Sequence, residues 1–467
     1  MRRTAYLNLL LASGLATVVA AQPAPTGPGI RIEYTEETLP NGLKVIYHVD
    51  RSAPVAAVVM WYDVASKHEE PGRTGFAHLF EHLMLFTGSR NVPEGQYFAM
   101  LEAAGGRAGP DLNGTTSADR TNYFAQIPSN ALELALWLEA DRMATLDDAL
   151  SQAKLDNQRE VVKNERRQGM DNQPYGLWGQ KMLGHMFPAG HIYHHPVIGS
   201  LEDLNNADLE SVREFFRTYY VPNNAVLVVA GDLDLAEARA LVHRYFGPIP
   251  AGAAPPPLRD AAIPPRLGRT VREVVEDANA PAPAVYVGFR VPNARSERSA
   301  AVSTLTTLLA GGRSSPLFSR LVREQQVATN VFAFNFGLVE AEDLLVIGAV
   351  GRPGLSPDSL ERAVLAEIDR AAALVTQEEL ERVKASTRYG FVNQLQTLGG
   401  FGGRADLLAQ GWTFHRDPGW VHRRLRELDA VTVDDLHRLV GDRMGTDNRA
   451  ILVFVPRAAA TSTPSDR

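Results

Sequence analysis

Two histidines and a glutamate stand close together in the segment FAHLFEHLMLFTGS at positions 76–89. In a helix, residues three and four apart lie on one face, so His78, Glu81 and His82 would project together from a segment rich in Phe, Leu and Met. Buried without partners, these polar groups would be costly. A zinc ion relieves that cost for the imidazoles, and Glu81 can then take a proton from a metal-bound water. The spacing H-x-x-E-H therefore predicts one Zn²⁺ per chain, bound by His78 and His82, with Glu81 as the catalytic base.

A third ligand must come from elsewhere, because two imidazoles rarely hold a catalytic zinc and a carboxylate on another helix usually completes the site. The downstream segment LDNQREVVKNERRQ, at 155–168, offers Glu160 and Glu165. The two glutamates are five residues apart, so they do not share a helix face. The residue types alone leave both candidates open.

The elements that would position these residues follow a recurring order. GLKVIYHV, PVAAVVMWYDV and RTNYFAQIP have the composition of strands, and helices are expected at 129–145 and 151–187. The second helix is interrupted near Asn172-Gln173-Pro174. Runs of strands followed by runs of helices predict an α+β fold, with helices on an antiparallel sheet.

The sequence predicts two related halves; the alternative is two unrelated α+β domains. VPNNAVLVVAGD at 221–232 resembles GTDNRAILVFVP at 445–456, and a Pro/Ala-rich stretch separates them. We expect domains at 30–247 and 269–458, a linker at 248–268 and a disordered tail at 459–467. Aligning the halves puts Val302, Leu305 and Thr306 at the positions of His78, Glu81 and His82, so the second half would have no zinc site.

Composition and the N-terminal sequence limit the class of protein and its cellular location. The formal charge of −7 argues against a nucleic-acid binder, and the absence of cysteine excludes disulfides and thiolate zinc sites. Arg2 and Arg3 precede an apolar run that ends near Val19-Ala20-Ala21, which predicts a signal peptide at 1–21. The alternative is an uncleaved membrane anchor. Cleavage would leave an exported protein that does not bind the membrane, and the periplasm is its predicted location.

Several motifs resemble those of one family, the pitrilysin/insulinase zinc metallopeptidases, or inverzincins, in the short-chain branch with the mitochondrial processing peptidase subunits. The resemblance spans about 30–456. It implies two homologous halves, each an antiparallel sheet covered by helices, in the fold of the LuxS/processing-peptidase metalloenzymes. The matching segments are HLFEH (78–82), NGTTSADRTNYF (113–124), REVVKNERRQ (159–168), YHHPVIGS (193–200), VPNNAVLVVAGD (221–232) and GGRSSPLFSRLVRE (311–324).

The resemblance also suggests roles for individual residues around the metal. The family's third ligand ends the pattern R-x-V-x-x-x-E, which is Glu165 here, although the usual spacing from His82 points nearer Glu160. We expect Glu165 to be the ligand. A glutamate often stands seven residues before it in the family, where this chain has Gln158. Gln158 and Glu160 are therefore expected around the metal ligands.

Other family roles fall on the edge strand and on the second half. The segment that begins at Asn113 matches a strand that takes up substrate as an additional strand. Arg323 matches an arginine that binds the substrate main chain, unless it is an ordinary surface arginine. Its partner tyrosine is replaced here by Asn330. We therefore predict substrate contacts from Asn113, Arg323 and Asn330.

These expectations combine into one function and one rival. The chain is predicted to be a zinc metalloendopeptidase that hydrolyses peptides or unfolded segments with Glu81. Long family members carry four such units and this chain has two, so a second chain is expected to complete the chamber. The missing tyrosine favours a heterodimer with a related subunit over a homodimer. The rival function is a non-catalytic peptide-binding or assembly subunit of a heteromeric complex.

Overall fold

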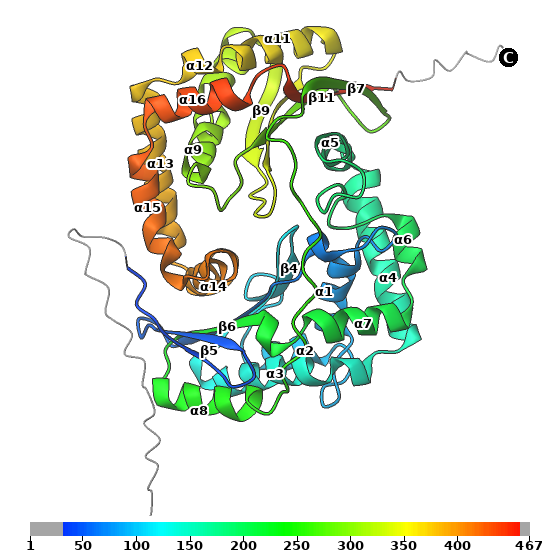
Figure 1. The fold of residues 1–467 in the computed structure, drawn as a ribbon, viewed down its shortest axis with the longest axis vertical. Coiled ribbons are helices and arrows are strands. Elements are labelled where there is room, and N and C mark those ends of the chain that lie inside the picture. The colour runs from blue at the N-terminus through cyan, green and yellow to red at the C-terminus, as the bar shows by residue number, and fades with distance from the viewer. Residues whose placement is uncertain (1–30, 458–467) are drawn as a thin grey trace, which may run out of the picture. The chain divides into compact units, whose positions relative to one another are not determined.

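The first half folds around a six-stranded sheet (Figure 1) in the computed structural model, which describes residues 31–457. Its strand order is β1-β2-β6-β3-β5-β4, so β4 lies at an edge. The strands are β1 (Thr35–Thr38), β2 (Lys44–Val49), β3 (Val55–Tyr62), β4 (Leu112–Thr116), β5 (Thr121–Pro128) and β6 (Ala225–Gly231).

The second half repeats this arrangement with five strands in the order β7-β11-β8-β10-β9. In both sheets the last strand of the half inserts between two earlier ones, parallel to one and antiparallel to the other. The predicted antiparallel sheets therefore contain one parallel pair each, while the predicted homology of the halves is confirmed. The strands are β7 (Arg269–Asp277), β8 (Ala284–Val291), β9 (Ala328–Asn335), β10 (Asp343–Gly351) and β11 (Asn448–Pro456).

Helices of the first half occupy the expected regions. The predicted interruption of the long helix is a π-helical turn at Arg167–Asp171, followed by an irregular segment that contains Pro174. The helices are α1 (Phe76–Phe86), α2 (Gln96–Ala103), α3 (Leu132–Ala149), α4 (Gln152–Arg166), α5 (Trp178–Met186), α6 (Leu201–Asn206), α7 (Leu209–Tyr219) and α8 (Leu235–Phe246).

Residues 248–268, the predicted linker, contain neither helix nor strand. The predicted signal peptide at 1–21 and tail at 459–467 lie outside the described residues. The helices of the second half are α9 (Ser299–Ala310), α10 (Pro316–Phe318), α11 (Pro357–Asp369), α12 (Ala371–Leu374), α13 (Gln377–Gln394), α14 (Arg404–His415), α15 (Val421–Ala430) and α16 (Val433–Arg443).

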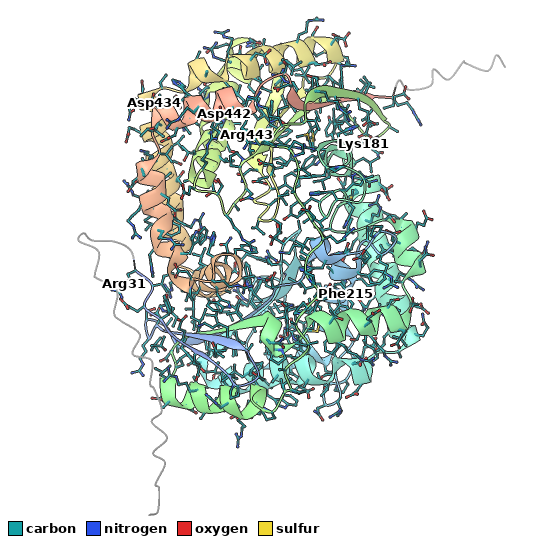
Figure 2. All side chains as sticks on the ribbon, in the orientation of Figure 1. Arg31, Lys181, Phe215, Asp434, Asp442 and Arg443 are labelled. Carbon is teal, nitrogen blue, oxygen red and sulfur yellow. The ribbon has the colours of Figure 1, made fainter. Side chains whose placement is uncertain are left out.

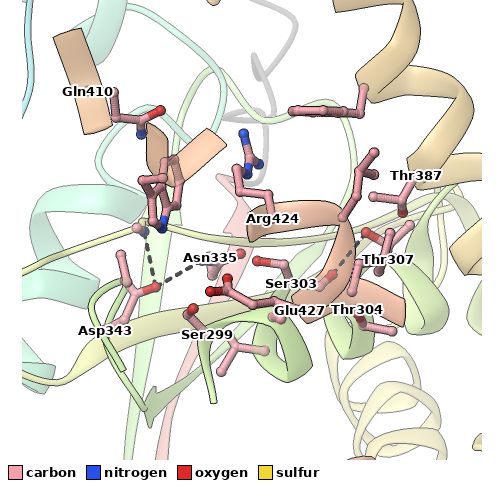
Figure 3. A pocket seen from close by; sticks show the side chains of 18 of the residues that line it. Ser299, Ser303, Thr304, Thr307, Asn335, Asp343, Thr387, Gln410, Arg424 and Glu427 are labelled. Carbon is pink, nitrogen blue, oxygen red and sulfur yellow. Dashed lines mark hydrogen bonds between the residues drawn. The ribbon is translucent and has the colours of Figure 1, made fainter. Parts of the chain in front are cut away.

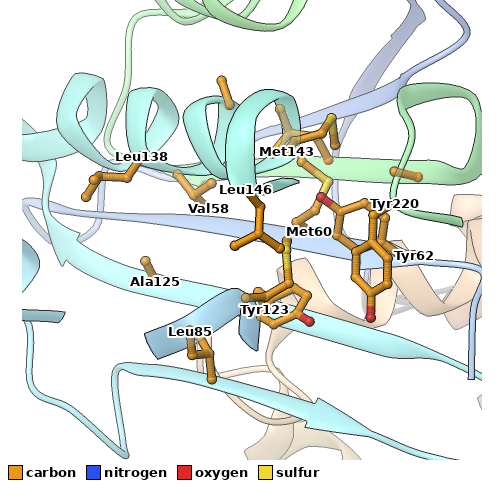
Figure 4. Close-up of a cluster of buried hydrophobic side chains, with 14 of the residues drawn as sticks. Val58, Met60, Tyr62, Leu85, Tyr123, Ala125, Leu138, Met143, Leu146 and Tyr220 are labelled. Carbon is orange, nitrogen blue, oxygen red and sulfur yellow. The ribbon is translucent and has the colours of Figure 1, made fainter. Parts of the chain in front are cut away.

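Strand β3 is buried on both faces, which explains its nearly continuous apolar sequence. Side chains alternate between the two faces of a strand. Val58, Met60 and Tyr62 pack in the core beneath α3 (Figure 4), whereas Val59 and Trp61 point into a separate apolar cluster. Alternate residues of β3 therefore pack in two different hydrophobic clusters, one on each face of the sheet.

The second cluster joins the halves, because α14 of the second half covers this other face of the first sheet. In return, α5 of the first half packs Met182 and Met186 against the second sheet. Lys181 of α5 (Figure 2) lies 2.6 Å from the Glu273 carboxylate on β7. Each half thus buries a face of the other's sheet, and the described residues from Ile32 onward form a single compact unit.

A buried ion cluster adds a polar contact between the halves. Lys67 is only 2% exposed, and its ammonium lies 3.0 Å from the Glu340 carboxylate in the second half. Asp63 and Asp119 lie 3.5 and 3.6 Å from the same nitrogen. Burial lowers the pKa of Lys67, but the three carboxylates outweigh burial and hold this pKa above its ordinary value.

Replacing this cation should destabilise the protein. In Lys67→Met, the buried Asp119 loses its cationic partner at the boundary between the halves, whereas Asp63 and Glu340 keep Arg416 and Arg295. We expect the free energy of unfolding to fall by about 3–5 kcal/mol. Urea denaturation followed by circular dichroism measures the loss. Lys384→Met, at a more exposed position, is the control and should change stability by less than about 0.5 kcal/mol. Equal stability of the two variants would contradict a structural role for the cluster.

Candidate metal centre

The helix that carries His78, Glu81 and His82 begins in an unusual way. Gly75 precedes α1 with a φ of +92°, and a Cβ there would lie 2.7 Å from the Ile198 carbonyl oxygen, so glycine is required. No side chain at this position caps the helix. Instead, the buried Glu69 carboxylate accepts hydrogen bonds from the Gly75 and Ala77 amides at 2.8 and 2.7 Å. Burial raises the pKa of Glu69 to about 8, although these two amides oppose the shift.

The end of α4 is tied to the start of α1 through one loop. Arg166 donates to the Gly199 carbonyl oxygen at 2.7 Å and to Gln180 at 2.8 Å. Gly199 in turn packs so closely on the backbone of Thr74 and Gly75 that a side chain there would clash. This chain of contacts fixes the last turn of α4, and with it Glu165, relative to the histidines on α1.

The donor atoms of His78, His82 and Glu165 converge. The Nε2 atoms of His78 and His82 lie 3.8 and 3.4 Å from Glu165 Oε2, and one donor atom from each residue lies within 4.8 Å of the others. Two ligands of a tetrahedral zinc stand roughly 3.3 Å apart, given bonds of about 2.0–2.1 Å. Across residues 31–457, this is the one group of three or more His, Asp or Glu side chains with such spacing. Its separations match those required by a single small cation.

The protonation states also suit a metal. Burial and, to a smaller extent, the neighbouring His82 lower the pKa of His78 to about 4, while Glu165 opposes the shift. The hydrogen bond with His82 holds the pKa of Glu165 below its ordinary value, against the effect of burial. A neutral imidazole and a carboxylate are the forms that bind zinc. The Nδ1 atoms of both histidines are buried without a hydrogen-bond partner among the described residues, so no second contact fixes the tautomer of either ring.

Glu81 lies on the same helix but has a separate environment. It is 8% exposed, and its Oε2 accepts a hydrogen bond from Thr116 at 2.7 Å. Burial raises the pKa of Glu81, while Thr116 lowers it. Strand β4 passes so close that a Cβ at Gly114 would lie 3.2 Å from Glu81 Cγ. The carboxylate is thus held against the edge strand β4.

The two glutamates left open by spacing alone have different surroundings. Glu165 reaches the histidines, whereas Glu160 lies 2.6 Å from Lys163 on the exposed side of α4. Gln158 is buried on α4, and its Oε1 has no hydrogen-bond partner among the described residues. Glu160 therefore lies away from the cluster, because side chains five residues apart point about 140° apart around a helix axis.

The remaining predicted residues are dispersed. Asn113 on β4 donates to the Gly109 carbonyl oxygen at 3.3 Å and is part of the strand next to Glu81. Arg323 lies in the second half at an exposed π-helical turn, with its guanidinium 5.6 Å from the Phe318 ring centre. Asn330 is exposed on β9, which is the edge strand of the second sheet as β4 is of the first. Of these three, only Asn113 belongs to an element that contacts the candidate centre.

Two residues that support the candidate metal centre, Thr116 and Glu69, were not predicted from the sequence. Thr116 lies within the motif at 113–124, but its hydrogen bond to Glu81 depends on how β4 lies against α1. Glu69 caps α1 from six residues before Gly75, which is beyond the range of ordinary capping patterns. An acidic residue shortly before a helix that lacks an N-cap is the one signal that could have indicated its role.

Two models of the same family match the chain. "Insulinase (Peptidase family M16)" matches residues 44–183, and "Peptidase M16 inactive domain" matches residues 206–387. The zinc protease PqqE of Helicobacter pylori is 29% identical over 427 residues, covering 90% of this chain and 91% of that protein. An uncharacterized zinc protease of Mycobacterium leprae is 28% identical over 416 residues, covering 87% and 89%. The chain belongs to the M16 peptidase family, that of pitrilysin and insulinase, as its motifs predict.

Solved structures share the fold. The crystal structure of a protease from Helicobacter pylori superposes with a TM-score of 0.84 at 26% identity, covering 91% of this chain and 100% of that one. Pitrilysin superposes with a TM-score of 0.72 at 19% identity, covering 95% of this chain and 46% of pitrilysin. The predicted fold, two related halves with helix-covered sheets, is therefore confirmed.

Substituting the two glutamates on α4 tests the ligand assignment. Glu165→Gln should lose most bound zinc after dialysis, because a neutral amide is a poor zinc ligand, whereas Glu160→Gln should retain it. Atomic emission spectrometry of the dialysed proteins gives the zinc content per chain. Equal zinc content in both variants would overturn the assignment of Glu165.

Proposed function

We propose that the chain is a zinc-dependent metalloendopeptidase that hydrolyses peptides or unfolded polypeptide segments. The convergence of His78, His82 and Glu165 beside a buried Glu81 carries the proposal. Family membership and relatives that are named zinc proteases support it. A non-catalytic subunit would have no need of the three donor atoms or the neighbouring base.

In this mechanism the Nε2 atoms of His78 and His82 and one oxygen of Glu165 would hold the metal. A zinc ion bound there would supply Lewis-acid polarisation of the peptide carbonyl and would lower the pKa of a water. Glu81 accepts a proton from the attacking water and returns it to the departing amine. The hydrogen bond from Thr116 orients the Glu81 carboxylate, and burial brings its pKa closer to neutral pH, where a base is most effective.

The edge strand supports an extended substrate. Strand β4 pairs with β5 on one side only, and its residues 112–116 run beside Glu81. A peptide added as a further strand would form main-chain hydrogen bonds that tolerate many sequences and would bring a carbonyl close to the base. Only a peptide or an unfolded segment can adopt this conformation. Asn113 would contact such a strand directly, and Arg323 and Asn330 would bind its main chain from the second half.

A second chain is proposed to complete the enzyme. This chain corresponds to about half of pitrilysin, since it covers 46% of that structure. Asn330 stands where the family has a tyrosine, and an amide reaches less far than a phenolic hydroxyl. A related subunit with the intact arginine–tyrosine pair would supply the missing donor, while a homodimer would depend on Asn330 itself.

Export to the periplasm is proposed from the N-terminal sequence and one relative. The Escherichia coli protein PqqL, described as a periplasmic protease, is 28% identical over 225 residues, which cover 46% of this chain and 23% of PqqL. Among residues 31–457, no helix has the length and apolar content needed to cross a membrane.

Loss of the base tests catalysis directly. Glu81→Gln should reduce cleavage of a quenched fluorescent peptide library by about 10²–10⁴-fold while zinc content stays unchanged, because only the proton acceptor is removed. Glu94→Gln, at an exposed position, is the control and should retain full activity. Zinc-loaded wild-type protein that binds the peptides without cleaving them would favour the non-catalytic alternative.

Purified protein tests the need for a partner. Alone, the chain should show low peptidase activity, which should rise when a related subunit bearing the arginine–tyrosine pair is added. Sedimentation velocity should then detect a complex of the two chains. Full activity from a monomeric single-chain preparation would contradict the paired arrangement.

A further inference from the structure

The second half contains a cavity of about 330 Å³ that belongs to no site described above (Figure 3). It lies between α9, α13, α14 and α15, and its size falls at the lower end of the range of small-ligand pockets. Ser299, Ser303 and Thr304 line it from α9, and Thr387 from α13. The wall is thus partly polar, unlike an ordinary packing defect.

One cation, Arg424 of α15, lies in the wall without a carboxylate in direct contact. No carboxylate in the described part of the chain comes within 4.0 Å of its guanidinium, which lies 5.5 and 5.1 Å from the ring centres of Phe391 and Trp420. Trp420 in turn stacks on His415 at 4.4 Å. The rings hold the guanidinium by cation–π contacts and leave its N–H donors available.

The other titratable groups of the lining do not neutralise Arg424. Glu427 attracts Arg424 electrostatically but only partly offsets the effect of burial, which lowers the pKa of Arg424; Glu427 is itself exposed and lies 4.0 Å from Arg423. Asp343 is buried and accepts hydrogen bonds from Asn335 and three backbone amides. Burial lowers the pKa of His415 to about 4, so this ring is neutral at pH 7.

A buried hydroxyl in the lining also lacks a partner. Thr304 is 2% exposed, and its Oγ1 makes no hydrogen bond with any described residue. An unsatisfied buried hydroxyl is unfavourable, so a ligand that bonds to it gains relative to the empty cavity. The hydroxyl is covered in the empty cavity, and a ligand would bond to it once the Thr304 side chain turns toward the cavity.

The cavity occupies the place that corresponds to the candidate metal centre of the first half. Helix α9 is the counterpart of α1, and Val302, which lines the cavity, aligns with His78. Helix α13 begins after the Thr376 cap as α4 begins after the Ser151 cap. The duplicated architecture thus keeps an opening between the same two helices but replaces the metal ligands with apolar and hydroxyl side chains.

We propose that this cavity binds the free carboxyl terminus of a peptide, with the carboxylate on Arg424 and the preceding amide groups on the α9 hydroxyls. Because the lining holds one cation and also the carboxylates of Asp343 and Glu427, it favours a singly charged carboxylate over a more highly charged phosphate. The Trp420 and Phe391 rings provide apolar contact for a terminal side chain. The proposal rests on the proposed function only in taking a peptide as the carrier of the carboxylate.

Calorimetry on the full chain, stripped of metal with EDTA, tests this pocket apart from the metal centre. The probes are N-acetyl-Ala-Ala-Phe with a free carboxylate and the same peptide as its carboxamide. The acid should bind at least about tenfold more tightly, because a charge-assisted hydrogen bond is lost in the amide. Arg424→Gln should abolish this preference, whereas Arg426→Gln, an exposed arginine of the same helix outside the cavity lining, should keep it.

Three results would overturn the proposal. These are equal binding of acid and amide, a preference that survives Arg424→Gln, and Arg424-dependent binding of inorganic phosphate as tight as that of the acid. If Arg424→Gln fails to fold, Thr304→Val serves instead and should weaken both peptides by about 2–10-fold; unchanged affinity would count against the pocket. Since no cleavage is measured, an Arg424-dependent preference in a protein that proves inactive with zinc would contradict the proposed function alone.

Discussion

Helix α1 imposes the constraint on which the site depends, because it brings two imidazoles and a carboxylate into an apolar interior. Such groups are stable there only when each has a partner. Thr116 on β4 is the partner of Glu81, and Glu165 on α4 is the partner of the two imidazoles. The helix itself needs Glu69, since its first amides would otherwise be buried and unpaired. The candidate metal centre therefore arises because α4, β4 and the segment before α1 each supply a partner for a polar group of α1.

The wider architecture keeps these elements in register. The central strands of each sheet are apolar on both faces. Helix α14 of the second half covers one face of the first sheet, and α5 of the first half covers one face of the second, so each sheet is buried only with the help of the other half. Arg166 and the loop at Gly199 connect α4 to α1, which sets the distance from Glu165 to the histidines. Lys67 adds a buried charge contact between the halves close to the segment that leads into α1. Fixing the metal ligands and joining the halves are thus two results of the same packing.

The sequence predicts features that depend on short-range periodicity and misses those that depend on distant pairing. Helical spacing predicts that His78, Glu81 and His82 share one face and that Glu160 and Glu165 do not, and the structure agrees. The choice of Glu165 over Glu160 depended on the family motif. The parallel pairing of β2 with β6 could not be read from either strand, because an apolar strand buried on both faces fits either direction. The Glu69 cap, the Lys67 cluster and the cavity at Arg424 all join residues that are remote in sequence or patterned like ordinary surface residues.

The central claim is that His78, His82 and Glu165 together bind one zinc ion. Anomalous diffraction from crystals of the zinc-loaded protein, recorded on both sides of the zinc absorption edge, tests it most directly. The account predicts one strong peak per chain about 2.0–2.2 Å from the two Nε2 atoms and a Glu165 oxygen. A peak coordinated by other residues, or no peak between these three side chains, would contradict it.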